Sequence, residues 1–167
     1  MGLDTYIDII IPTKKPLVYN ELEYKEFTFE LLYLRKYFNV AQSLDEFIAK
    51  NSDNEFSCRV DATPEMTEDL LNIIKSHYEK ALYSEDEEDD LTNWGKGSEI
   101  YTLGLFVHNF NVLKAFTESY FNFETFIKAL HFDKWESSKN EDLMEFMLEH
   151  KDDIEWRGME LEITNSY

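Results

Sequence analysis

The chain has 167 residues and a formal net charge of −19, with 43% hydrophobic and 16% aromatic residues. This apolar content excludes a disordered acidic tail, because such tails lack the surface that offsets the entropy of ordering. The charge disfavours direct contact with nucleic acid or anionic membranes, since both require clustered lysine and arginine. The length predicts one domain over residues 1–167. The charge favours basic proteins or cations as partners, or serves solubility through self-repulsion.

The first predicted element is a strand over residues 5–12, which are rich in β-branched side chains and end at a proline. From about Phe29 to Ile48 the apolar residues recur at helical spacing, which predicts a helix. Inside it, Ser43 and Glu46 have the spacing of a capping box that would restart the helix after a short break. One helix and two helices are both open alternatives here.

A short strand is predicted at residues 55–61, where Phe56, Cys58 and Val60 alternate with polar residues. The next helix is marked at its start by Thr63 as a cap and by Pro64 in the first turn. Its apolar stripe consists of Leu70, Ile73, Ile74, Tyr78, Ala81 and Leu82.

Further helices are predicted after residue 98. Helical spacing covers residues 100–116 and continues over 123–130, and Asn140 would cap a helix over 140–150. The tail, 153–164, alternates apolar and polar residues as a closing strand does. The sum is an α+β fold in a single compact domain: four or five helices pack with a small sheet that can pair the N- and C-terminal strands.

Charge is segregated along the chain. Residues 84–90 carry −6 and residues 133–162 carry −7, whereas residues 91–132 are neutral and hold ten aromatic side chains. Residues 1–50 carry −2 and residues 51–83 carry −4. This pattern predicts a hydrophobic centre flanked in sequence by two strongly negative regions.

The acidic run opens a predicted loop at 84–98, for which three interpretations compete. A calcium loop of EF-hand type is disfavoured because no glycine stands at the sixth position. A solvated loop and an interaction surface are the other two. The solvated loop ranks first for the run taken alone. The second negative region adds support for the interaction surface, since its acids recur every three to four residues and would line one helical face.

We accordingly predict a partner-binding surface made of acids and aromatic anchors. Its loop acids are Glu85, Asp86, Glu87, Glu88, Asp89 and Asp90. Its helix and tail acids are Glu141, Asp142, Glu145, Glu149, Asp152, Asp153 and Glu155, and its anchors are Trp94 and Trp135.

Signals for catalysis are weak. The chain has no phosphate loop, since GKGS at 95–98 lacks its upstream glycine, and no GxGxxG, GxSxG or HExxH. Its four histidines, His77, His108, His131 and His150, never fall three to five residues apart, so we expect no metal site and no cofactor. The one cysteine, Cys58, is interpreted as a small buried hydrophobe. A lone cysteine and an amino terminus without secretory features lead us to expect a cytoplasmic protein without a membrane segment.

The opening MGLD with Tyr6, together with ELLYLRK at 30–36, resembles a loose group of small bacteriophage and prophage proteins. That group begins Met-Gly-Leu-Asp, has an early Glu-Leu-x-Tyr-x-Arg-Lys helix, and carries a later helix similar to TEDLLNII here. The resemblance implies a phage-like origin and placement of residues 30–36 in a helix. It transfers no catalytic residue.

The leading hypothesis is a non-enzymatic phage accessory protein whose acidic surface binds a basic host protein. Inhibition of a nucleic-acid-handling or defence enzyme by nucleic-acid mimicry is the form we expect. A second hypothesis is a small enzyme with a site assembled from Cys58, a histidine and carboxylates in one concave pocket. A third is a self-associating structural protein.

Overall fold

The computed structural model describes residues 3–83, 95–131 and 134–166, with the backbone alone described in 95–99 and 134–140. In chain order the elements are β1 (Asp4–Tyr19), β2 (Leu22–Arg35), α1 (Phe38–Asn51), β3 (Ser57–Asp61), α2 (Pro64–Tyr83), α3 (Gly95–Ser119), α4 (Phe123–Ala129), α5 (Lys134–Glu149), the short 3₁₀ turns η1 (Lys151–Asp153) and η2 (Trp156–Gly158), and β4 (Glu160–Ser166). Five α-helices and one four-stranded antiparallel sheet in these ranges confirm the α+β class.

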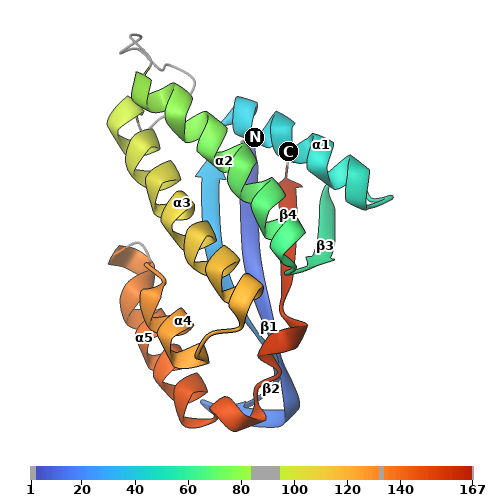
Figure 1. Cartoon of the computed structure of the whole chain (residues 1–167), viewed down its shortest axis with the longest axis vertical. Helices are drawn as coiled ribbons and strands as arrows, with labels where there is room; N and C mark the ends of the chain where they lie inside the picture. Colours follow the sequence, from blue (N-terminus) through green and yellow to red (C-terminus); the bar gives the residue numbers. More distant parts are fainter. Residues whose placement is uncertain (1–2, 84–94, 132–133, 167) are drawn as a thin grey trace.

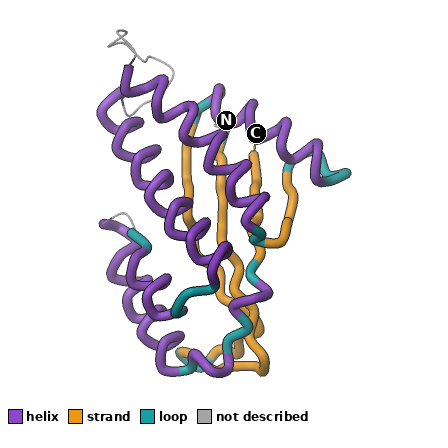
Figure 2. Tube along the Cα trace, viewed as in Figure 1, coloured by secondary structure: helices purple, strands orange, loops and turns teal. Residues whose placement is uncertain are grey.

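The sheet has the strand order β2-β1-β4-β3, so strands from the two ends of the chain are neighbours (Figure 1). Asp4 pairs with Ser166 and Ile10 with Glu160, which confirms the expected pairing of the N- and C-terminal strands. Alternate residues such as Ile7 and Ile163 are fully buried on the face toward the helices. The helices lie in front of the sheet in Figures 1 and 2, which gives a two-layer arrangement.

Strand β1 runs well past the proline that was expected to end it. It continues to Tyr19 and forms a long hairpin with β2 through Asn20 and Glu21, both with positive φ. Pro12 is accommodated because β4 pairs with β1 only as far as Ile10, so the missing N–H at Pro12 costs no bond to β4. The register shifts between Pro12 and Leu17.

The helix expected from Phe29 was wrong for its first part. Residues up to Arg35 form β2, so ELLYLR at 30–35 lies on a strand, and α1 begins only at Phe38. The cause is a register shift in the hairpin: Ile7 pairs with Leu32 but Asp8 pairs with Glu30, which leaves Leu31 as an extra residue. This bulge breaks the period-2 alternation of apolar residues and produces a spacing that imitates a helix.

The other predicted elements are mostly confirmed. Strand β3 and helix α2 occur as expected, and Thr63 Oγ1 accepts a hydrogen bond from the Met66 N–H as an N-cap. Ser43 does not form a capping box, because it lies inside a continuous α1 and its hydroxyl contacts the Asn39 carbonyl. Helix α5 begins at Lys134, so Asn140 is an interior residue and not a cap.

One cluster of buried residues joins the helices to the sheet, with members from β2, α1, α2, α3 and α4. The aromatic centre expected in residues 91–132 is confirmed for Phe110, Phe116 and Phe126, which are fully buried. The rings of Phe116 and Phe126 stack with 4.4 Å between centroids and hold α4 against α3.

Candidate functional site

The second half of α5, η1 and the residue before η2 form the surface that we call the C-terminal acidic surface: Glu141, Asp142, Glu145, Glu149, Asp152, Asp153 and Glu155. Its orientation follows from the apolar side of α5. Met147 is fully buried, and the Phe146 ring packs on Tyr19 of the hairpin with 4.8 Å between centroids. Glu141, Asp142, Glu145 and Glu149 are therefore on the exposed side. The turn after α5 is fixed by the Glu155 N–H, which donates to the Pro12 carbonyl at 2.9 Å.

Little of this negative charge is neutralised within the described chain. Asp153 lies 3.6 Å from the Lys15 ammonium and 4.0 Å from the His150 ring. The other six carboxylates of the C-terminal acidic surface form no ion pair with any described residue. They are consequently open to a cationic partner.

The remaining predicted contact residues cannot be placed. Glu85, Asp86, Glu87, Glu88, Asp89, Asp90 and Trp94 lie outside the described residues, and Trp135 lies in the part of α5 where only the backbone is described. Residues 95–98, which were expected in the loop, belong to α3. The end of α2 and the start of α3, which flank the acidic run, lie at one end of the long axis, and the end of α5 lies toward the other (Figure 1).

An aromatic cluster that the sequence did not indicate borders the C-terminal acidic surface. It consists of Phe116, Tyr120, Trp156 and Arg157. The Trp156 ring lies 5.5 Å from both the Tyr120 and the Phe116 ring centroids. The guanidinium carbon of Arg157 lies over Trp156 at 5.0 Å and over Tyr120 at 5.8 Å, within the range of cation–π contact. Tyr120 is 49% exposed, so the cluster reaches the surface. The sequence signal that could have indicated this aromatic cluster is the pair Trp156-Arg157 shortly before the last strand.

The face of the sheet that points away from the buried core carries a second set of acids missed by the sequence reasoning. Strand register places Glu30, Asp8 and Glu162 side by side on three adjacent strands. Burial, and after it the charge of Glu162, raises the pKa of Asp8 to about 6. Arg59 on β3 crosses this face to bond Glu160 at 3.0 Å and Glu26 on β2 at 2.9 Å.

Cys58 has the opposite properties from those of a nucleophile. Its side chain is only 4% exposed, and burial, followed by the charge of Glu162, raises the thiol pKa to about 11. A reactive cysteine needs an accessible thiolate. The environment of Cys58 therefore supports its interpretation as a small buried hydrophobe.

His108 and His131 serve structural contacts. The His108 and His131 rings stack with 4.1 Å between centroids, and His108 Nε2 bonds the Ala129 carbonyl at 2.8 Å. Asn109 binds both the N–H and the carbonyl of His131. Within residues 3–83, 95–131 and 134–166, no group of three or more His, Cys, Asp or Glu is arranged to hold a metal ion.

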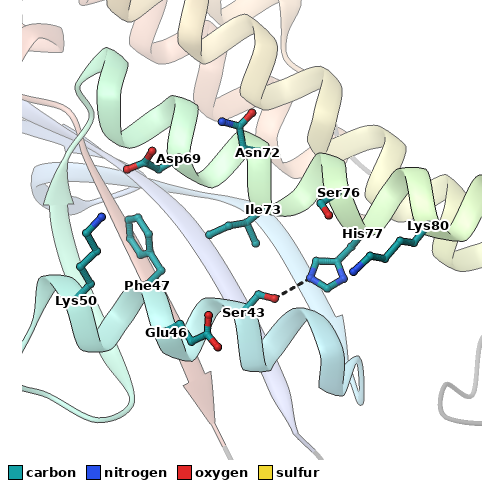
Figure 3. A pocket seen from close by; sticks show the side chains of 10 residues that line it. All are labelled: Ser43, Glu46, Phe47, Lys50, Asp69, Asn72, Ile73, Ser76, His77 and Lys80. Carbon is teal, nitrogen blue, oxygen red and sulfur yellow. Dashed lines mark hydrogen bonds between the residues drawn. The ribbon is translucent and has the colours of Figure 1, made fainter.

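A concave pocket lies between α1 and α2 (Figure 3). In it, Ser43 Oγ lies 2.9 Å from His77 Nε2, the distance of a serine and its base. The pair lacks the other parts of a hydrolytic site. Ser43 lies inside α1, where backbone N–H groups bond helix carbonyls and are not free to stabilise an oxyanion. Among the described residues, no third group bonds the other nitrogen of His77.

Comparison of the chain with models of known families, with curated proteins and with solved structures finds no match. Across the described ranges, no helix combines the length and the apolar content that a membrane crossing requires.

Proposed function

We propose that the protein binds a basic protein partner through the C-terminal acidic surface, with the aromatic cluster as its anchor. One observation carries this proposal: six carboxylates without an ion pair in the described chain run up to Trp156. Unneutralised carboxylates attract cationic partners at long range. Trp, Tyr and Arg are the residues that most often dominate interface energetics.

The spacing of the acids suggests which kind of partner to expect. Glu141, Glu145 and Glu149 are one turn apart, hence about 6 Å along the helix axis. The phosphates of one DNA strand are spaced by about 3.4 Å along the axis of the duplex. The row thus has a little more than half the charge density of a strand, enough to occupy a phosphate-binding groove but with strong sensitivity to salt.

The resemblance to small phage proteins supports a host enzyme as the target. We infer a cytoplasmic, non-enzymatic inhibitor of a nucleic-acid-handling or defence enzyme. The loop acids Glu85–Asp90 with Trp94, and also Trp135, stay predicted contacts. Because the segments flanking the loop lie far from the end of α5, a compact partner would engage one of the two regions, and an elongated partner both.

Capture from a bacterial lysate with matched charge variants tests the proposal. The test variant carries Glu141→Gln, Glu145→Gln, Glu149→Gln and Asp152→Asn. The control carries Asp53→Asn, Glu55→Gln, Asp61→Asn and Glu65→Gln, four exposed acids outside the hairpin and α5. Both change the net charge by the same amount, so only position distinguishes them.

We expect the wild type and the control to retain the same basic protein at low salt, and the test variant to lose it. Trp156→Ala should weaken retention without changing the net charge. Equal retention by the test variant and the control would refute the C-terminal acidic surface as the contact. A further variant with four of the loop acids changed to amides shows whether residues 85–90 contribute.

A further inference from the structure

The pocket between α1 and α2 has a volume of about 480 Å³, within the range of small-molecule sites. Its walls come from one face of each helix, since Ser43, Glu46 and Lys50 recur at three to four residues on α1. Helix α2 supplies the facing wall from Asp69 to Lys80. None of these residues belongs to the C-terminal acidic surface.

One end of the pocket is rich in hydrogen-bond donors. Ser76, His77 and Lys80 follow one another along α2, and Ser43 joins them through its contact with His77 (Figure 3). The Lys80 ammonium forms no ion pair with a described residue. Hydroxyl, imidazole and ammonium groups together are the donors that proteins use for phosphate and carboxylate oxygens.

The middle of the pocket holds two apolar side chains, and the Glu46 carboxylate lies beside Ser43 on the α1 wall (Figure 3). Phe47 and Ile73 line the pocket between the donor-rich end and the end formed by Lys50 and Asp69 (Figure 3). Apolar atoms beside a few convergent polar groups are the usual composition of a site for an organic ligand. A bare inorganic ion would leave this apolar part unused.

Local charge makes this pocket a more favourable place for an anion than the C-terminal acidic surface is. The charged groups around His77 in the pocket are Lys80 and Asp69 on α2 and Glu46 and Lys50 on α1, so the lining is neutral in a chain of net charge −19. Burial, and after it the charge of Lys80, lowers the pKa of His77. The positive charge of the Lys80 ammonium therefore acts at the donor-rich end, and it would attract an anion bound there.

We propose that this pocket binds a small organic anion. Its phosphate or carboxylate group would lie at Lys80, His77, Ser43 and Ser76, and its apolar body would lie over Ile73 and Phe47. The Ser43 hydroxyl can donate its single proton to only one of two acceptors at a time. These are His77 Nε2 at 2.9 Å and the Asn39 carbonyl at 3.2 Å. Protonation of His77 turns both ring nitrogens into donors, so anion binding and protonation of His77 reinforce each other.

Nuclear magnetic resonance of the His77 ring, identified with His77→Gln, provides the test. The probes are phenyl phosphate, benzoate, inorganic phosphate and benzylamine at millimolar concentration. We expect saturable shifts with phenyl phosphate or benzoate, weaker ones with inorganic phosphate, and a higher pKa of His77 in the bound state. The tighter of the two aromatic anions identifies the preferred acidic group.

Variants decide whether the pocket itself is responsible. Lys80→Met and Ser43→Ala should each weaken phenyl phosphate about tenfold or more, as expected for loss of a contact to a charged group. Lys75→Met, the same change on α2 outside the pocket, should leave the affinity unchanged. Absence of saturation with either aromatic anion, tighter binding of benzylamine, or an equal effect of Lys75→Met would overturn the proposal.

Discussion

The turn between β1 and β2 has two residues in the left-handed region of backbone conformation, and neither of them is glycine. Asn20 has φ of 50° and Glu21 has φ of 65°, and Tyr19 pairs directly with Leu22, so the loop has two residues. Both angles match a type I′ turn, in which asparagine is favoured first and glycine second. Glutamate at the second position carries a steric penalty from its Cβ.

Replacement Glu21→Gly should therefore stabilise the protein. The expected gain is about 0.5–1 kcal/mol, because glycine removes the left-handed penalty but loses more entropy on folding. Urea unfolding measures it. Glu23→Gly, two residues into β2, is the control and should destabilise. A loss of stability in Glu21→Gly would show that this turn is not strained.

The raised pKa of Asp8 predicts an unusual pH dependence. The folded protein keeps this proton up to about pH 6, whereas the unfolded chain releases it near the ordinary value of 3.8. The contribution to stability is therefore present below pH 4 and is lost as the pH rises to 6. Solvent access to the partly exposed group reduces the loss to about 1–2 kcal/mol.

At pH 7, Asp8→Asn should thus raise the free energy of unfolding by about 1–2 kcal/mol and should have little effect at pH 4. Chemical unfolding at a series of pH values gives the difference from the wild type. That difference isolates Asp8 from His77, whose lowered pKa acts in the opposite direction as the pH falls. Asp61→Asn, an exposed acid on β3, is the control. A pH-independent difference for Asp8→Asn would contradict the assignment.

Helices and strands were predictable where the pattern and the end signals agreed. Helix α2 was found because Thr63 caps it and Leu70 and Ile74 lie on one buried stripe. Strand β4 was found from its alternation. Strand β2 was mistaken for a helix because the bulge at Leu31 depends on pairing with β1, which lies outside any local window.

The candidate sites were predictable to a smaller extent. The exposed acids on α5 follow from spacing alone, since acids opposite an apolar stripe face solvent. The aromatic cluster was missed because Tyr120 and Trp156 are 36 residues apart and meet only in the fold. The pocket was missed for the same reason, since Ser43 and His77 come from different helices.

Asn165 connects three elements close to the end of the chain. It is fully buried, its Oδ1 accepts from Thr5 Oγ1 at 2.7 Å, and its amide donates to the Ala41 carbonyl at 2.9 Å and to Asp45 at 2.7 Å. It therefore fixes α1 against β1 and β4.

We expect Asn165→Ala to cost about 2–4 kcal/mol, because the Thr5 hydroxyl and the Ala41 carbonyl lose a buried partner. Thermal and urea unfolding measure this cost. Ser166→Ala, at the exposed neighbouring position, should be within about 0.5 kcal/mol of the wild type. An equally small effect of Asn165→Ala would mean that these bonds do not hold α1 in place.

The whole molecule carries much more negative charge than its ion pairs neutralise. Repulsion among carboxylates opposes the compact state, and salt screens it. We expect the melting temperature to rise between low and physiological ionic strength. The four-residue C-terminal variant and its matched control should both flatten this rise, since each removes the same charge. A melting temperature that falls with salt would contradict this view.

The salt dependence of partner binding should differ between the two variants, because binding depends on where the charge lies. The salt dependence of the melting temperature should be the same for both, because it depends on the total charge. The direct measurement is the slope of log Kd against log salt for the captured basic partner, with the wild type, the C-terminal variant and the matched control. If the C-terminal acidic surface is the contact, the C-terminal variant should have a clearly smaller slope than the wild type. The control should have the slope of the wild type. Equal slopes for the two variants would contradict the central claim that Glu141, Glu145, Glu149 and Asp152 bind the partner.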